Sequence, residues 1–256
     1  MKFFVTSDLH SFLEPFVKAL EASGFDKSNP EHYLVVCGDV FDRGDDSIEL
    51  LKFLMSIERK ILIRGNHDSL LEECCMREFP YSHDRSNGTV KTICAIGKAS
   101  SGYSFDECCR RTIDITAEYR ASLVNYLETE SYIFVHSWLP LKCSDSLPNH
   151  YIIDRQFEYD SGWRNASQSA WERAMWGNPY ELAAQGFNKT GKTIVFGHFH
   201  TSWPRAVFEG KPEFGEDADF SPYCGDGYIA LDACTVASGK TNVIVLEDNF
   251  LNKEGI

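Results

Sequence analysis

Five short apolar runs recur along the chain, and each of them ends in a cluster of polar residues. The runs cover residues 2–6, 33–37, 60–63, 131–135 and 193–196. Such nearly continuous apolar runs are typical of strands that are buried on both faces. The sequence therefore predicts five buried strands, with a polar cluster at the carboxyl end of each.

Helical patterns separate the first three strands. Ser11 opens a capping-box pattern before an apolar stripe, Asp46 can cap a second helix, and Ser69 repeats the cap pattern before a third. Regular alternation of strand and helix is typical of βαβ units. We therefore predict a largely parallel sheet in an α/β protein.

The remaining chain fits this alternation less well. Two late strands are expected at 228–231 and 242–246, joined as a closing hairpin. The stretches at about 79–125 and 140–192 are interpreted as insertions that border the site. Because no linker or internal repeat divides the sequence, we expect one elaborated domain over residues 1–256.

Composition and charge narrow the class of partner. The chain has 256 residues, enough for a sizeable α/β core, and a formal net charge of −13. An acidic surface repels phosphate backbones, so we expect no nucleic-acid partner. No apolar stretch approaches the ~20 residues needed to cross a bilayer, so no membrane partner is expected either. The sequence leaves the oligomeric state open.

The cysteines indicate the compartment. There are nine of them, an odd number, and none has the CxxC spacing of a zinc–thiolate site. The amino-terminal run also meets Asp8 too early for a signal peptide. These features predict free thiols in a reducing cytoplasm.

The polar clusters supply a set of candidate metal ligands, because the carboxyl ends of parallel strands meet at one edge of a sheet. The candidates are Asp8, His10, Asp39, Asn66, His136, His198 and His200. Carboxylates, an amide and imidazoles without a thiolate suit Mn, Fe, Zn or Ni. Seven candidates exceed one tetrahedral site and predict two divalent ions that share a bridging group.

Together the clusters resemble the five signature motifs of calcineurin-like metallophosphoesterases. The motifs lie at residues 8–10, 38–44, 65–68, 136 and 197–200. The Asp-Arg-Gly ending of the second motif and Arg64 before the third are similar to one branch of that family. This branch contains Ser/Thr protein phosphatases, bacteriophage-type phosphatases and diadenosine tetraphosphatases. The chain looks closest to its bacterial, Ser/Thr-phosphatase-like members.

The resemblance implies an α/β (α+β) fold of four layers, in which two stacked mixed β-sheets are flanked by helices. It also implies a dinuclear centre at one edge of the sheets. One ion would be held by Asp8, His10 and Asp39, and the other by Asp39, Asn66, His136 and His198. Asp39 would thus be the bridge, and His200 would complete the shell of the first ion.

The resemblance further implies a metal-dependent phosphoric ester hydrolase that cleaves phosphomonoesters, phosphoproteins among them. A metal-bridging hydroxide would attack phosphorus in line. Arg43, Asn66 and His67 would bind the phosphoryl group. His67 would also protonate the leaving oxygen, and Asp42 would orient its ring.

Two other functions stay open on the sequence. The same motifs would serve a diadenosine tetraphosphate-type nucleotide pyrophosphohydrolase, since its substrate presents a phosphoryl group to the same metals. A non-catalytic, metal-poor interaction scaffold is disfavoured, because none of the motif residues is missing.

A few residues depart from the family pattern or have weaker signals. Ser11 and Trp138 replace smaller residues, and we expect them to narrow the pocket. Asp232 could support a ligand from behind and His83 could reach the substrate, although structural roles are favoured for both. Trp171 and Trp176 could stack on a ring, but their spacing is more typical of core packing. The last four of these residues have no assigned function.

Overall fold

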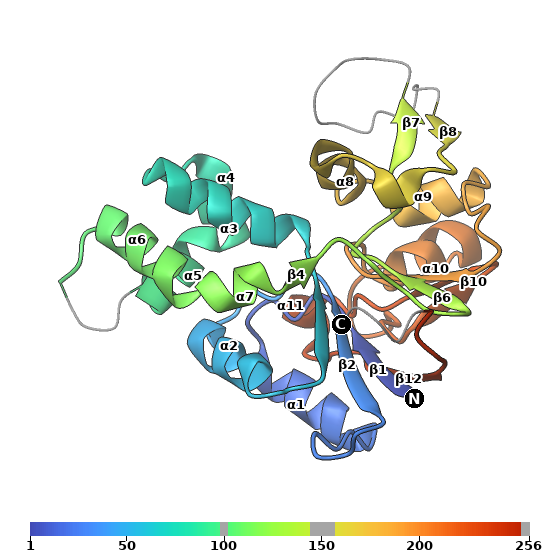
Figure 1. The fold of residues 1–256 in the computed structure, drawn as a ribbon, viewed down its shortest axis with the longest axis horizontal. Coiled ribbons are helices and arrows are strands. Elements are labelled where there is room, and N and C mark those ends of the chain that lie inside the picture. Colours follow the sequence, from blue (N-terminus) through green and yellow to red (C-terminus); the bar gives the residue numbers. More distant parts are fainter. Residues whose placement is uncertain (98–101, 144–156, 252–256) are drawn as a thin grey trace.

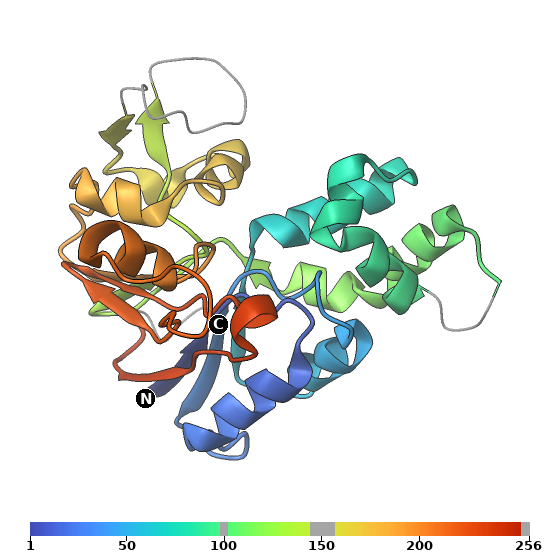
Figure 2. The same ribbon diagram turned by 180° about the vertical axis from the view of Figure 1, so that it is seen from behind.

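Two stacked β-sheets with helices on both outer faces make up the protein (Figures 1 and 2). The structure is a computed structural model that describes residues 1–97, 102–143 and 157–251. The predicted four-layer α/β architecture is confirmed. Within the described ranges, no helix combines the length and the apolar character that crossing a bilayer requires.

The first sheet has the strand order β12-β1-β2-β3-β4. Its strands are β1 (Lys2–Thr6), β2 (His32–Cys37), β3 (Lys60–Ile63), β4 (Leu123–Val124) and β12 (Ile244–Glu247). Strands β1 to β4 run parallel, and β12 pairs antiparallel with β1. The first three polar clusters therefore leave this sheet at the same edge.

The second sheet has the order β10-β11-β9-β6-β5. Its strands are β5 (Leu127–Glu128), β6 (Tyr132–Phe134), β9 (Thr193–Phe196), β10 (Tyr223–Gly225) and β11 (Tyr228–Ala230). Strand β9 runs parallel to both β6 and β11, whereas β5 and β10 are antiparallel to their neighbours. The fourth and fifth polar clusters follow β6 and β9.

Alternation along the buried strands explains why the sheets stack. In β1, Phe3 and Val5 point into the layer between the sheets, where they meet Phe134 and Val195 of the second sheet. Phe4 points the other way, into the core beneath the helices. Because successive side chains face opposite sides of a strand, a continuous apolar run can serve both layers.

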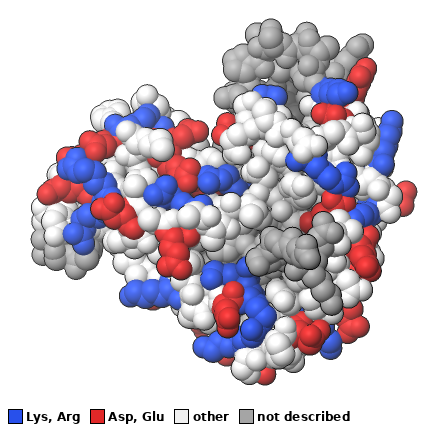
Figure 3. All heavy atoms as spheres, viewed as in Figure 1, with Lys and Arg blue, Asp and Glu red and all other residues white. Residues whose placement is uncertain are grey.

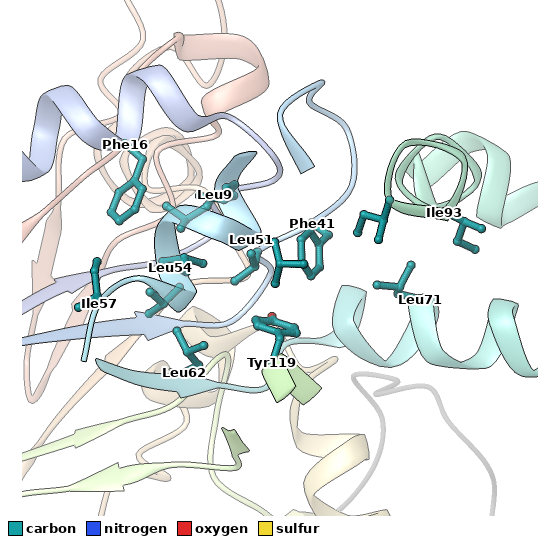
Figure 4. Packing of buried hydrophobic residues seen from close by; sticks show 14 of the residues in the cluster. Leu9, Phe16, Phe41, Leu51, Leu54, Ile57, Leu62, Leu71, Ile93 and Tyr119 are labelled. Carbon is teal, nitrogen blue, oxygen red and sulfur yellow. The ribbon is translucent and has the colours of Figure 1, made fainter. Parts of the chain in front are cut away.

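Helices α1 (Leu13–Ala22) and α2 (Ser47–Met55) cover the first sheet. The first insertion is helical and forms a cap together with α3. The cap consists of α3 (Asn66–Arg77), α4 (Ser82–Asn87), α5 (Thr89–Gly97), α6 (Phe105–Ile115) and α7 (Ala117–Ala121). Figure 4 shows that the core beneath the sheet continues into this cap, where Phe41 meets Tyr119. Their rings lie 5.1 Å apart in an edge-to-face contact.

The second insertion covers the other sheet. It includes β7 (Leu141–Cys143), β8 (Phe157–Tyr159), η1 (Trp163–Asn165), α8 (Gln168–Ala174) and α9 (Pro179–Ala184), and its residues 144–156 lie outside the described chain. Helix α10 (Ser202–Glu209) follows β9. Trp171 is buried and stacks on Tyr126 at 5.2 Å, so this tryptophan belongs to the core, as its spacing indicated.

Asp46 lies at the N-cap position of α2 as predicted, although its side chain makes no capping bond to that helix, and the other two predicted caps are wrong. The backbone N–H of Leu13 donates to the carboxylate of Asp46 (3.1 Å), while Ser11 bonds to the hydroxyl of Ser47 (2.9 Å). Helix α3 begins at Asn66 and not at Ser69. Ser11 and Asp46 therefore tie loops to one another, whereas Asp68 accepts from the backbone N–H of Gly65 (2.8 Å) and closes a capping box at the start of α3.

The predicted closing hairpin is also wrong. Strand β11 pairs with β9 in the second sheet, whereas β12 pairs with β1 in the first. The short helix α11 (Thr235–Ser238) lies between them in the chain. The chain thus crosses from the second sheet to the first between these two strands. The turn residues between them do not distinguish such a crossover from a hairpin.

Candidate metal centre

The loops after β1, β2 and β9 contain a concentration of unusual backbone conformations. Nine non-glycine residues in the described ranges have a positive φ. Seven of them lie in these loops: Asp8, His10, Ser11, Asp39, Asp42, Arg43 and His198. A left-handed residue costs about 1–2 kcal/mol, and such outliers cluster where function fixes the backbone. The surrounding packing therefore holds these loops in place.

Two glycines allow the loops to approach so closely. A Cβ at Gly65 would overlap the carboxylate of Asp39, and one at Gly197 would overlap the carboxylate of Asp8. Each glycine directly precedes a candidate ligand, Asn66 or His198. The motif glycines therefore allow two loops to pack closely against each other, in addition to permitting turns.

We expect Gly197→Ala to weaken metal binding by about 10- to 100-fold, because displacing a group that supports the ligands costs about that much affinity. Metal titration followed by calorimetry measures this effect. Gly210→Ala is the matched control, since Gly210 has a positive φ but open space around its Cβ position. Equal affinity in Gly197→Ala and the wild type would contradict the close-approach argument.

Asp39 lies at the centre of the cluster and is buried. Its Oδ1 is 3.4 Å from His136 Nε2, and its Oδ2 is 3.7 Å from His10 Nε2. Two sets of potential ligand atoms, each within 4.8 Å of one another, share this residue: His10, Asp39 and His67, and Asp39, His136 and His198. This geometry supports Asp39 as the bridge between two ions.

The histidines present lone pairs to this centre. His10 Nδ1 donates to the carbonyl of Phe41 (2.8 Å), and His136 Nδ1 donates to the carbonyl of Cys37 (2.9 Å). With Nδ1 bonded to a carbonyl, each ring turns its Nε2 toward the centre, which is the arrangement of many metal-binding histidines. Burial lowers the pKa of His10 to about 3, which keeps that ring neutral and able to bind a cation.

Acceptors face one another in the remaining set. Asn66 Oδ1 lies 2.7 Å from the inward Nε2 of His136. Asp8 accepts a hydrogen bond from the backbone N–H of His198 (2.9 Å), and burial together with Asp39 raises its pKa to about 8. Because two buried carboxylates and several lone pairs converge, the donor set fits divalent cations, which would relieve this repulsion.

His200 is not brought into the cluster. Its Nδ1 bonds to Ser202 (2.9 Å), and its Nε2 lies 3.3 Å from a carboxylate oxygen of Glu213. Neither set of potential ligand atoms includes it. Both ring nitrogens of His200 thus have partners outside the cluster, and the structure does not bring this residue together with the other predicted ligands.

A second hydrogen-bonded group adjoins the cluster. His67 Nδ1 donates to Asp42 Oδ2 (2.7 Å), and Arg43 Nη2 lies 3.5 Å from His67 Nε2. Burial alone would lower the pKa of His67, but Asp39 and Asp42 outweigh it and raise the pKa above its ordinary value. His67 therefore tends to carry a proton close to the centre.

Sequence reasoning missed the support for this group from the cap. Thr89 of α5 donates its hydroxyl to Asp42 Oδ2 (2.7 Å), and Thr92 accepts from the backbone N–H of Asp42 (3.1 Å). No motif marks these threonines, since only the fold brings α5 to the loop after β2. The cap thus fixes the carboxylate that holds His67.

The expectation that Ser11 and Trp138 narrow the pocket is wrong. Both are buried, with Ser11 bonded to Ser47 and Trp138 packed against Phe196 in the core of the second sheet. The neighbouring Ser137 connects its loop to the second insertion, because its hydroxyl donates to the carbonyl of Gly177 (2.7 Å). These departures from the family pattern therefore act on the scaffold behind the site.

The two weaker candidates have different surroundings. His83 is half-exposed on α4 and lies 3.3 Å from the carboxylate of Asp84. Asp232 is buried, accepts from the backbone N–H of Cys234 (2.7 Å), and has its pKa raised by burial and then by Asp8. Asp232 is therefore a buried carboxyl within electrostatic reach of Asp8.

Known proteins resemble the chain in sequence and in fold. The family described as calcineurin-like phosphoesterase matches residues 1–202. A bis(5'-nucleosyl)-tetraphosphatase (symmetrical) of Buchnera aphidicola is 38% identical over 69 residues, which are 27% of this chain and 24% of the relative. One from Coxiella burnetii is 26% identical over 140 residues, which are 54% of this chain and 42% of the relative. The chain thus spans less than half the length of these curated relatives.

A solved structure agrees in fold over most of the chain. A cold-active protein tyrosine phosphatase superposes with a TM-score of 0.52 and 15% identity, covering 96% of this chain and 73% of that protein. At this identity the likeness shows the shared fold alone.

Proposed function

Because the chain belongs to the calcineurin-like phosphoesterase family, we propose that it is a dinuclear metal-dependent phosphomonoesterase. The observation that carries this proposal is the position of Asp39, which is shared by both sets of potential ligand atoms. Small phosphoesters or phosphoproteins are the proposed substrates. The proposal places the enzyme in the cytoplasm, whose reducing conditions suit a chain with an odd number of cysteines and no CxxC spacing.

The proposed ligands fall into two sets around Asp39. Asp8 and His10 would hold the first ion with Asp39, and Asn66, His136 and His198 would hold the second with it. Two divalent ions there supply a nucleophile from water at neutral pH and neutralise charge on phosphoryl oxygens. Mn, Fe, Zn and Ni all suit this donor set.

The residues beside the ions supply the remaining chemistry. Arg43, permanently charged, is placed to bind phosphoryl oxygens next to the centre. His67 would give its proton to the leaving oxygen, because Asp42 holds its ring and helps to raise its pKa. Asn66 would contact the phosphoryl group as well as the second ion.

A substrate and metal screen tests the proposal. We expect the protein, stripped with chelator and reloaded with Mn, Ni, Fe or Zn in turn, to hydrolyse nitrophenyl phosphate and phosphopeptides. The stripped protein should lose at least about 10³-fold in rate, because bound metal supplies several kcal/mol of charge stabilisation. Activity that survives complete metal removal would contradict a metal-dependent mechanism.

Dinucleoside tetraphosphate hydrolysis is the second candidate function. The names of the Buchnera and Coxiella relatives favour it, although the chain matches less than half of each relative. The formal net charge of −13 disfavours a polyphosphate chain. Diadenosine tetraphosphate therefore belongs in the screen, and a strong preference for it over monoesters would make it the primary substrate. A metal-poor scaffold stays disfavoured, since the proposed ligands converge.

A further inference from the structure

A groove of about 480 Å³ lies between the cap and the second insertion. Figure 1 shows α3 and α8, which form its two sides, facing each other across the molecule. Its lining includes Ser69, Glu73 and Met76 from α3 and Arg173 and Trp176 from α8 and the residues after it. Two of its lining residues lie near proposed ligands, since Ser69 follows Asn66 by three residues in α3 and the Trp176 ring lies 6.4 Å from that of His198.

Trp176 is the residue that joins this groove to the centre. The His198 ring donates a hydrogen bond to the backbone carbonyl of Trp176, and its ring lies 6.4 Å from the indole in an edge-to-face arrangement. The next carbonyl, of Gly177, accepts from Ser137. Two hydrogen bonds from the metal-site loops thus fix the backbone that carries Trp176.

The indole of Trp176 is nevertheless available to a ligand. The residue is 44% exposed, whereas the nearby Trp171 and Trp163 are buried in the core. A large apolar ring held in one position loses little further entropy when another ring packs on it. Trp176 is therefore suited to recognise a planar group that enters the groove.

The charged residues that line the groove indicate which kind of group it can accept. Three glutamates line it beside two arginines, and one of them, Glu72, already pairs with Arg64 at 2.9 Å. A chain of further phosphates would meet these carboxylates without a matching excess of cations. An uncharged ring attached to the ester oxygen would instead meet the indole of Trp176, whose ring lies 6.4 Å from that of the proposed ligand His198.

We propose that Trp176 is a specificity-determining residue that packs on the aromatic leaving group of an aryl phosphomonoester, such as a phosphotyrosyl side chain. This inference rests on the proposed phosphomonoesterase function and specifies its substrate class. Hydrolysis would break the bond between phosphorus and the aryl oxygen, add water to phosphorus, and return a proton to the phenol.

The test compares Trp176→Ala with the wild type, both loaded with Mn, on two peptides that differ only in phosphotyrosine or phosphoserine. The ratio of kcat/KM for the two peptides is taken in each protein, so the intrinsic reactivity of the aryl ester cancels between proteins. We expect the ratio to fall about tenfold in Trp176→Ala, in the range of a lost ring–ring contact. Trp176→Phe should restore most of it.

Controls separate recognition from damage to the centre. Phe208→Ala removes another exposed ring, on α10, and should leave the ratio unchanged. If Trp176→Ala contains less metal than the wild type, Trp176→Leu replaces it, because Leu keeps bulk without an aromatic face. An unchanged ratio in the metal-loaded variants overturns the inference alone. Adenosine 5'-monophosphate is assayed as a third substrate, and a fall in kcat/KM confined to it in Trp176→Ala overturns the aryl assignment. A wild type that hydrolyses no substrate overturns both proposals.

Discussion

Asp39→Asn leaves fewer than two ions per chain and lowers kcat/KM by at least about 10³-fold. An amide has one oxygen and one N–H donor group, so it can no longer offer an acceptor atom to each of two cations. The observed distances place one carboxylate oxygen toward His136 and the other toward His10. The loss in rate follows from the several kcal/mol that bound metal supplies.

Elemental analysis after dialysis measures the ion count of this variant, and Mn-dependent thermal stability provides a second readout. Mn at 100 times its dissociation constant should stabilise the wild type by about 2.7 kcal/mol, because only the folded state holds the assembled site. Asp39→Asn should show a smaller shift. Asp45→Asn, at an exposed carboxylate that pairs with Lys91, is the matched control. Two tightly held ions in Asp39→Asn would exclude its bridging role.

The parts of the fold that follow from local pattern could be predicted. The runs at 2–6, 60–63 and 193–196 are strands with the expected bounds, because apolar runs of this length can only be buried on both faces of a sheet. The convergence of Asp8, Asp39 and Asn66 also follows from the pattern, since β1, β2 and β3 are parallel neighbours whose carboxyl ends meet at one edge of the first sheet.

The errors arise where a distant residue decides a local structure. Ser11 has the sequence context of a cap, but the N–H of Leu13 is taken by Asp46, which is 33 residues away. The i, i+2 spacing of His198 and His200 suggested a shared cavity. The chain instead turns between them, and Glu213 and Ser202 engage His200. Such partners cannot be read from the motif.

The support from the insertions could not be predicted at all. Thr89 reaches Asp42 from the cap, and the carbonyl of Trp176 orients His198 from the second insertion. Neither segment has the regular strand–helix alternation of the rest of the chain, so the sequence indicates only that each segment borders the site. Those segments now connect the metal centre to the groove where substrate choice would be made.

The geometry of His67 is compatible with two functions, those of a metal ligand and of a general acid, and an experiment can distinguish them. Its Nε2 lies 3.9 Å from Asp39 Oδ2, within the range of potential ligand atoms, and its Nδ1 is fixed by Asp42. As a metal ligand His67 must have an unprotonated Nε2, whereas as a general acid it must carry a proton on that atom. The hydrogen bond from Nδ1 to Asp42 (2.7 Å) favours the acid, because a carboxylate partner stabilises the doubly protonated ring.

We therefore expect His67→Ala to keep two ions and to lose about 10²- to 10⁴-fold in kcat on alkyl phosphates, the usual contribution of a positioned acid. The loss should be much smaller on nitrophenyl phosphate, because its leaving oxygen departs without a proton. His83→Ala, which removes a half-exposed histidine on the cap, is the control. Equal losses on both substrates would contradict protonation of the leaving group by His67. The loss of one bound ion would instead identify His67 as a metal ligand.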